Sequence, residues 1–324
     1  MILIMTPEEE KKIAQWGRKL NDEIPLDLIL TKNKQNELFR DFCDSLGRIA
    51  PKIRIKVEHE EDPIPPVIRI GNVGYQAIPA GEELEPFLNV LNDSADYVKQ
   101  LPLSLRNQLD ELKIHALLKI YITPQCPFCP AMVKRLLSLA AVNEYVKITI
   151  IDGALFPEMA ESDNIHSAPT VLLDDQFRWS GLVEVQEIVD IILNRDPAQL
   201  SAASLKSMFA EGDAVKVGNM MLDNEKFFPA LLELLVNEKW PVRLGAMVAF
   251  ETIATKDNKL AAYAVPFLWK SFPQAKDTVK GDILYLLGQT RNDKVIPKLK
   301  KVLNGPYPLD IKEAAEEALE EFNH

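Results

Sequence analysis

The sequence of 324 residues predicts two α/β units in tandem, followed by an all-α helical repeat domain. Three observations support this prediction. Strand-like and helix-like segments alternate in the same order twice before residue 196, strand-like segments stop at about Pro197, and helix pairs recur from there to the C-terminus. We therefore expect three domains, at residues 1–93, 94–196 and 197–324.

The first unit begins with an amphipathic helix at residues 7–20. Thr6 precedes this helix and Glu9 lies three residues later, which is the spacing of a capping box. The later segments alternate in type and are a strand at 26–30, a helix at 36–49, strands at 53–57 and 67–70, a turn at 71–74, and a closing helix at 82–91.

The second unit repeats this order and indicates an internal duplication. Its expected elements are a strand at 117–122, a helix at 126–141, strands at 146–151 and 171–173, and a helix at 183–193. Thr31 corresponds to Thr123, and Pro66-Val67 corresponds to Pro169-Thr170. Each unit is expected to form a small mixed sheet covered by helices.

Only the second unit carries a Cys-x-x-Cys pair, Cys126 and Cys129, between a predicted strand and a predicted helix. A helix N-terminus presents unpaired N–H groups and a partial positive charge, which favour the thiolate that attacks disulfides. Pro127 suits the first helical position. We expect Cys126 to be the exposed attacking residue and Cys129, one turn inside the helix, to resolve the mixed disulfide.

A metal site is the alternative interpretation of this pair. The only other cysteine is Cys43, and the four histidines form no pair at ligand spacing. We therefore favour a redox dithiol over structural zinc or an inert reduced pair, and we expect no metal and no cofactor. Cys43 lies within a predicted helix, where a small buried role is expected and a second redox role is the alternative.

The segment Ile165-His166-Ser167-Ala168-Pro169-Thr170 resembles the cis-proline loop of thioredoxin-fold proteins. Residues 5–194 are similar to the N-terminal domain of the flavoprotein subunit of alkyl hydroperoxide reductase and to glutaredoxin-like protein disulfide oxidoreductases. The most specific stretches are 78–84, 123–130, and 151–153 with Phe156. The resemblance implies a thioredoxin-like fold for both units, and substrate binding by Ala168, Pro169 and Thr170.

The resemblance also implies further site residues. Glu83 corresponds to an acidic residue that, in the peroxide-reductase relatives, reaches the active-site cysteines across the unit boundary. Glu83 is therefore a candidate proton acceptor for Cys129, with a solvated surface residue as the alternative. Thioredoxin itself has a buried aspartate in the strand before the dithiol, whereas this chain has Ile120. His166 would lie near the dithiol and modulate its pKa as a cation, and a solvent-facing loop histidine is the alternative that we favour.

The helical region resembles HEAT-type repeats. The first helix of each of its three pairs begins at a proline, which is Pro229, Pro266 or Pro297. The second helix of each pair begins with an apolar residue followed by a basic residue. Residues expected to stack between repeats are Leu231, Leu235, Ala246 and Phe250. A less regular pair at 200–210 and 214–222 would cap the stack. Trp240, Trp269 and Tyr285 are expected in the core, with anchors for a partner protein as the alternative.

Charge and hydropathy indicate which class of partner and which cellular location to expect. The net charge of −11 disfavours a nucleic-acid partner. The sequence has no apolar run of membrane length, and its N-terminal apolar stretch is too short for a secretory signal, so we expect a cytoplasmic protein.

These observations predict a thiol-disulfide oxidoreductase that acts on protein disulfides, with the helical repeats docking a partner. The sequence has no Gly-x-Gly-x-x-Gly motif after residue 194, so an external thiol or a reductase is the expected electron donor. The alternative is a redox-sensing interaction scaffold in which the dithiol switches partner binding. Pro127-Phe128 resembles the glutaredoxin spacer, but it leaves the direction of electron transfer open.

Overall fold

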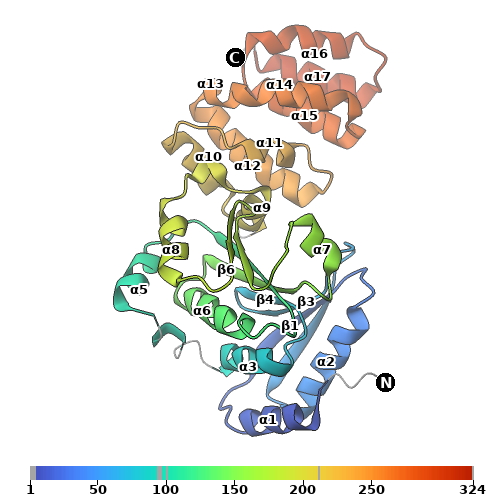
Figure 1. Ribbon diagram of the computed structural model, residues 1–324. Helices are drawn as coiled ribbons and strands as arrows, with labels where there is room; N and C mark the ends of the chain where they lie inside the picture. Colours follow the sequence, from blue (N-terminus) through green and yellow to red (C-terminus); the bar gives the residue numbers. More distant parts are fainter. Residues whose placement is uncertain (1–4, 93–96, 100, 211, 323–324) are drawn as a thin grey trace. The chain divides into compact units, whose positions relative to one another are not determined.

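The computed structural model describes residues 5–92, 97–99, 101–210 and 212–322 (Figure 1). It contains two compact units, residues 1–194 and residues 195–324. Both predicted α/β units fall within the first compact unit. The predicted boundary between residues 93 and 94 lies outside the described residues, as does His324.

The first α/β half follows the predicted order. Thr6 caps the first helix as predicted, since the Glu9 amide donates to Thr6 Oγ1 at 3.3 Å and the Thr6 amide donates to the Glu9 carboxylate at 2.6 Å. The elements are α1 Pro7–Gly17, β1 Ile24–Leu30, α2 Asn36–Ile49, β2 Ile53–His59, β3 Val67–Ile70, β4 Val73–Gln76, the 3-10 turn η1 Gly81–Glu83, and α3 Leu84–Asn92.

The second α/β half differs from the prediction at the dithiol. Its elements are α5 Leu103–Asp110, β5 Ala116–Ile122, α6 Cys129–Val142, β6 Val146–Asp152, α7 Pro157–Ser162, β7 Thr170–Leu173, β8 Phe177–Ser180 and α8 Val185–Asn194. Helix α6 begins at Cys129, not at Cys126. Pro130 lacks an N–H and is tolerated only in the first turn of a helix, which places the helix start directly before it.

The two halves share one eight-stranded sheet, in the order β2-β1-β3-β4-β6-β5-β7-β8. Each half contributes four strands of mixed direction, and the sequence did not indicate that the two sets would join edge to edge. Strands β4 and β6 pair in parallel and join the halves, which buries the sheet edge that each half would otherwise expose. Phe39 and Phe156 continue the contact across the halves, with ring centroids 6.2 Å apart.

Apart from α7, the helices of this unit form a continuous row of contacts, α2–α1–α3–α6–α5–α8 (Figure 1). Helix α6, which carries the dithiol at its start, therefore packs between α3 of the first half and α5 of the second. Its buried face consists mainly of large apolar side chains, which are Met132, Val133, Leu136, Leu137 and Leu139. This burial fixes the position of the helix start.

The second compact unit is helical throughout its described part. Its longer elements are α9 Ala202–Ala210, α10 Ala214–Asp223, α11 Pro229–Leu235, α12 Trp240–Lys256, α14 Val265–Ser271, α15 Asp277–Gln289, α16 Ile296–Leu303 and α17 Leu309–Glu320, with the short α13 Asn258–Ala261 between α12 and α14. The first helices of successive pairs contact one another (α9–α11–α14), and so do the second helices (α10–α12–α15–α17). Leu231, Leu235, Ala246 and Phe250 are fully buried, and their stacking between HEAT-type repeats stays a prediction.

Two aromatic residues depart from the expected core positions. Trp240 is 50% exposed and Tyr285 is 40% exposed, whereas Trp269 is half-buried. The interior beside Trp240 is occupied by Arg243, which is 3% exposed and pairs with Asp282 at 2.6 Å. The Tyr285 hydroxyl donates to the Glu251 carboxylate at 2.9 Å, which holds the ring at the surface.

Close packing of α10 on α12 depends on Gly218. A Cβ at this position would lie 2.7 Å from the Ala249 carbonyl oxygen and 2.7 Å from Thr252 Cβ. We predict that Gly218→Ala lowers the free energy of unfolding by about 1–3 kcal/mol, because the two helices must separate. The measurement is urea unfolding followed by circular dichroism. Gly281→Ala is the matched control, since nothing lies within 4 Å of its Cβ position, and equal stability of the two variants would contradict the prediction.

No helix in the described ranges is both long enough and apolar enough to span a bilayer.

Candidate active site

The parallel strands at the centre of the sheet bring three loops to one edge. Strands β4, β6 and β5 run parallel, so their carboxyl ends lie at the same edge of the sheet. The loops that follow these strands contain residues 77–83, 153–156 and 123–128. Strand β7 runs antiparallel to β5 and starts at this edge, where Thr170 pairs with Tyr121. The topology therefore gathers the dithiol, the proline loop and the Glu83 turn.

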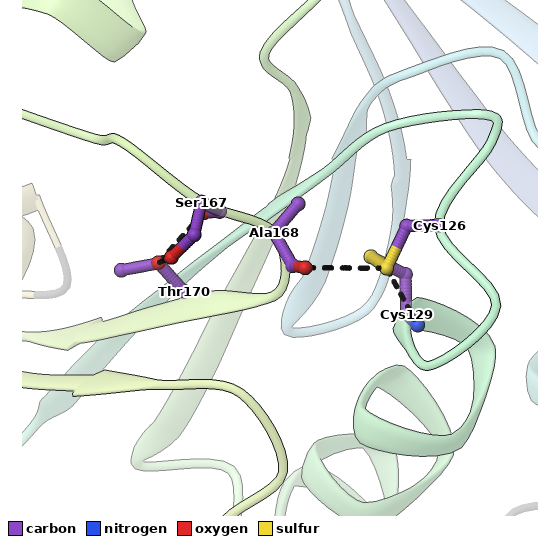
Figure 2. The surroundings of a disulfide bond; sticks show 5 residues. All are labelled: Cys126, Cys129, Ser167, Ala168 and Thr170. Carbon is purple, nitrogen blue, oxygen red and sulfur yellow. Dashed lines mark hydrogen bonds between the residues drawn. A yellow bond between two sulfur atoms is a disulfide. The ribbon is translucent and has the colours of Figure 1, made fainter.

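Cys126 and Cys129 form a disulfide, and their Cα atoms are 5.5 Å apart (Figure 2). The two cysteines differ in accessibility. Cys129 is fully buried in the first turn of α6, whereas Cys126 is half-buried in the turn that precedes the helix. Cys126 is therefore the more accessible of the two sulfurs, and its role as the attacking residue stays a prediction.

The start of α6 supplies a hydrogen-bond donor to the accessible sulfur. The backbone amide of Cys129 points at Cys126 Sγ, with an N···S distance of 3.1 Å. This amide has no acceptor within the helix, because the first N–H groups of any helix lack a preceding turn. In the reduced protein the same donor would stabilise negative charge on Cys126 and favour its thiolate.

The proline loop lies directly against the disulfide. The Ala168–Pro169 peptide bond is cis, and among the described residues it is the only cis bond, so the corresponding Pro65–Pro66 bond of the first half is trans. The Ala168 carbonyl oxygen is 3.4 Å from Cys126 Sγ (Figure 2). Pro169 is buried, and its carbonyl accepts a hydrogen bond from the Gly181 amide at 2.8 Å.

Thr170 does not present its side chain to the site. It is 1% exposed, and its hydroxyl donates to the Ser167 carbonyl at 2.8 Å (Figure 2). The Thr170 side chain therefore braces the loop from inside, and substrate binding by the backbone of Thr170 and its neighbours stays a prediction. Sequence reasoning missed Ser167, although a Ser-x-x-Thr spacing is typical of such local side-chain to backbone bonds.

Glu83 is a buried carboxylate without a hydrogen-bond partner in the described part of the chain. It is 7% exposed, and neither of its oxygens accepts a hydrogen bond. Burial raises the pKa of Glu83 to about 7, an effect that the charge of Lys134 partly opposes. The η1 turn that carries Glu83 contacts helix α6. This environment differs from the solvated surface that was the alternative for Glu83.

Two residues near Glu83 were not anticipated from the sequence. The Tyr75 hydroxyl is buried and has no hydrogen-bond partner among the described residues, and burial raises its pKa well above the ordinary value, with Tyr97 and Glu83 adding to the shift. Lys134 on α6 forms an ion pair with Glu85 at 2.9 Å. No local sequence signal links these residues to Glu83, since Tyr75 lies on β4 and Lys134 lies on α6.

His166 and Cys43 lie outside this constellation. His166 is exposed, and within the described ranges it forms no hydrogen bond and no ion pair, which matches a solvent-facing loop histidine. Cys43 is fully buried in α2, and burial raises its pKa to about 12. Cys43 therefore stays a thiol at neutral pH, as suits a small core residue.

Two exposed apolar side chains, here called the apolar rim, lie next to the cysteines in the chain and beside the proline loop, and the second of them was not anticipated from the sequence. Phe128, between the two cysteines, is 57% exposed, and Leu182 is 47% exposed. Leu182 follows Gly181, whose amide is bonded to Pro169, and Arg135 of α6 donates to the Val183 carbonyl at 2.7 Å. These bonds hold Leu182 beside the proline loop.

No group of three or more His, Cys, Asp or Glu side chains that could hold a metal ion occurs in the part of the chain that the structure describes.

Comparison with known proteins agrees with this geometry. Residues 117–193 match the family described as "Thioredoxin domain". This part of the chain is a thioredoxin-like domain. A protein disulfide oxidoreductase from Aeropyrum pernix has the same fold, with a TM-score of 0.53 and 16% identity over 62% of this chain and 97% of that chain.

Two curated relatives are also similar to this chain. An "NADH dehydrogenase" from Ferdinandcohnia aciditolerans is 24% identical over 219 residues, which cover 66% of this chain and 41% of the relative. One of the subunits of alkyl hydroperoxide reductase of Staphylococcus epidermidis is 27% identical over 161 residues, which cover 48% of this chain and 31% of the relative. The chain thus matches less than half the length of these relatives, and both relatives are named as oxidoreductases.

Proposed function

We propose that this chain is a thiol-disulfide oxidoreductase that exchanges electrons with protein disulfides through Cys126 and Cys129. The observation that carries the proposal is the placement of the Cys126 sulfur. It is accessible, receives the Cys129 amide at 3.1 Å, and lies 3.4 Å from the Ala168 carbonyl. A relative of the same fold is named as a protein disulfide oxidoreductase.

The proposed cycle starts from the reduced dithiol. The Cys126 thiolate attacks one sulfur of a substrate disulfide, the substrate S–S bond breaks, and the other substrate sulfur leaves with its electron pair and takes up a proton. Cys129 then loses its proton and attacks Cys126 in the mixed disulfide. The second substrate thiolate leaves, and the Cys126–Cys129 disulfide forms. An external thiol or a reductase returns two electrons and two protons to the protein.

Glu83 is proposed as the acceptor of the Cys129 proton. A buried thiol such as Cys129 has no direct route to bulk water, so a base at the same sheet edge would assist the second step. A pKa of about 7 makes Glu83 ionised in a large fraction of molecules at neutral pH, while keeping it basic enough to take a proton. We assign no step to His166.

The substrate site is proposed at the proline loop and the apolar rim. Ala168 and Pro169 lie against the disulfide, and Pro169 offers no N–H that would compete with an incoming peptide. Phe128 and Leu182 would contact apolar side chains of an extended substrate segment. Thr170 acts indirectly, because its hydroxyl holds the loop through Ser167.

Turnover tests this function directly. We expect the protein to catalyse reduction of insulin and of a small model disulfide by dithiothreitol, with many disulfides reduced per chain. A single stoichiometric oxidation, together with changed binding of a partner, would contradict the enzyme and favour the redox-sensing scaffold.

The helical unit is proposed as a HEAT-like docking domain, on the basis of the repeated sequence pattern and the layered contacts of its helices. We predict that a chain ending at Asn194 reduces a small model disulfide within about twofold of the full chain, since the first unit is compact by itself. Its activity on the natural protein substrate should fall, because a docking surface is lost. Steady-state rates on both substrates provide the measurement, and equal losses on the two substrates would contradict a docking role.

We further propose a cytoplasmic location and an electron donor outside this chain. A reducing compartment keeps exposed dithiols cycling, whereas structural disulfides are typical of oxidising compartments.

A further inference from the structure

The helical unit has an open groove of aromatic, proline and lysine side chains, here called the Trp269 groove. Its volume is about 650 Å³, and the residues that line it include Trp269, Phe272, Lys300, Lys301, Gly305 and Tyr307. They come from α14, the turn after it, α16, and the loop before α17. The groove therefore lies between two successive helix pairs.

Ring contacts organise the aromatic floor of the groove. The Trp269 and Phe272 rings stack with centroids 5.5 Å apart and an interplanar angle of 7°. Phe272 is fully buried and also contacts Tyr307 edge-on, with centroids 5.5 Å apart. The buried Phe272 thus fixes two more accessible rings, which makes the floor rigid before any partner binds.

Gly305 allows the loop before α17 to close over Tyr307. A Cβ at Gly305 would lie 2.9 Å from the Lys301 carbonyl oxygen and 2.9 Å from the Tyr307 ring. Any larger residue must push the ring or the loop away. The groove shape therefore depends on a residue without a side chain.

The charge of the groove is opposite to that of the whole chain. Lys300 and Lys301 are exposed and have no ion-pair partner within the described ranges, and Lys298 Nζ lies 5.0 Å from the centroid of the Trp269 ring. Among the described residues that line the groove, none is acidic. The chain carries a net charge of −11. Unpaired lysines beside an aromatic floor favour a ligand that combines carboxylates with an apolar group.

We propose that the Trp269 groove docks a segment of a partner protein in which acidic residues flank an apolar or aromatic side chain. The apolar side chain contacts Trp269 and Tyr307, and the acidic residues pair with Lys300 and Lys301. The proposal deepens the docking role in the proposed function by naming the surface and the chemistry of the partner. The net charge of −11 disfavours a nucleic acid as the occupant.

The test uses the full chain and fluorescein-labelled synthetic peptides of twelve residues, each rich in Asp and Glu around one central Trp, Phe or Leu, with fluorescence anisotropy as the readout. We expect at least one such peptide to bind, and its affinity to fall when the central residue is replaced by Ser. The double variant K300E/K301E should bind about tenfold more weakly, because two attractions become repulsions. The matched control K11E/K19E makes the same change of net charge on exposed lysines of the first unit and should bind normally.

Gly305→Ala provides a second variant that leaves the charge unchanged. It should weaken binding of the aromatic peptide and have little effect on a peptide with a central Ser. Three results would overturn the proposal: no peptide binds, K300E/K301E and K11E/K19E bind equally, or these variants selectively lose binding to a single-stranded oligonucleotide or an anionic vesicle instead. Reduction of a small model disulfide, measured in parallel, reports on Cys126 alone, so failure of the groove and failure of the redox function are distinguishable.

Discussion

Cys126→Ser is expected to abolish catalytic reduction of disulfides, with a loss of at least about a thousandfold in turnover. The hydroxyl of serine does not ionise near neutral pH and forms no disulfide, so neither the attack nor the covalent intermediate can occur. The measurement is insulin reduction by dithiothreitol. Cys43→Ala is the control and should keep full activity, because Cys43 is buried away from the dithiol. An active Cys126→Ser variant would remove the basis of the proposed mechanism.

The complementary variant, Cys129→Ser, should accumulate a mixed disulfide with the substrate. Cys126 remains able to attack, but no second thiol resolves the mixed disulfide, so the substrate stays covalently bound. Non-reducing gel electrophoresis and mass spectrometry should show one substrate chain attached at Cys126. If the adduct formed at Cys43, or if no adduct formed with any disulfide, the assignment of Cys126 as the attacking residue would be refuted.

Glu83→Gln should slow the resolution step by about 100-fold, which is the range expected for the loss of a positioned base. The wild-type rate should rise with pH and level off above about 7, because the Glu83 carboxylate ionises there. The variant should lack this inflection. Stopped-flow detection of the second substrate thiol, released in a single turnover, measures the step. Glu82→Gln is the matched control, since Glu82 is the exposed neighbour, and a loss of the inflection in that variant would contradict the assignment.

The raised pKa of Glu83 also predicts a change of stability with pH. The folded chain holds the Glu83 proton more tightly than the unfolded chain, in which Glu83 has the ordinary pKa of 4.5. The contribution of Glu83 to the free energy of unfolding is therefore fully present below about pH 4.5, and it is lost as the pH rises through about 7. Glu83→Gln should be about 1–3 kcal/mol more stable than wild type at pH 8, and should differ little at pH 4. Urea unfolding at pH 4 and at pH 8 measures this difference in stability independently of catalysis.

The order of the elements followed from local sequence patterns. Helix α2 and strand β3 have the predicted bounds, and the capping box of Thr6 and Glu9 forms as expected, because capping and alternation depend on neighbours within a few residues. The start of α6 was misplaced by three residues. Two prolines, Pro127 and Pro130, both suit a first helical turn, and a local pattern does not choose between them.

Part of the candidate site was likewise visible in the sequence. The Cys-x-x-Cys pair, the proline loop and Glu83 were found by motif and by resemblance to a family. The rim residue Leu182 and the Glu83 neighbours Tyr75 and Lys134 were not. The packing of η1 on α6 and the pairing of β4 with β6 bring Lys134 and Tyr75 to the site. The hydrogen bonds from Gly181 to Pro169 and from Arg135 to Val183 place Leu182 there.

The sequence by itself therefore determined the local chemistry of this protein: which residues form helices and strands, where the dithiol sits, and which segments repeat. Only the tertiary structure decided that the two halves share one sheet, that Glu83 is buried with a raised pKa, and that Trp269, Phe272 and Tyr307 line one groove. The reason is physical. Propensity, capping and spacing act over a few residues, whereas desolvation and ring packing depend on contacts between segments far apart in the chain.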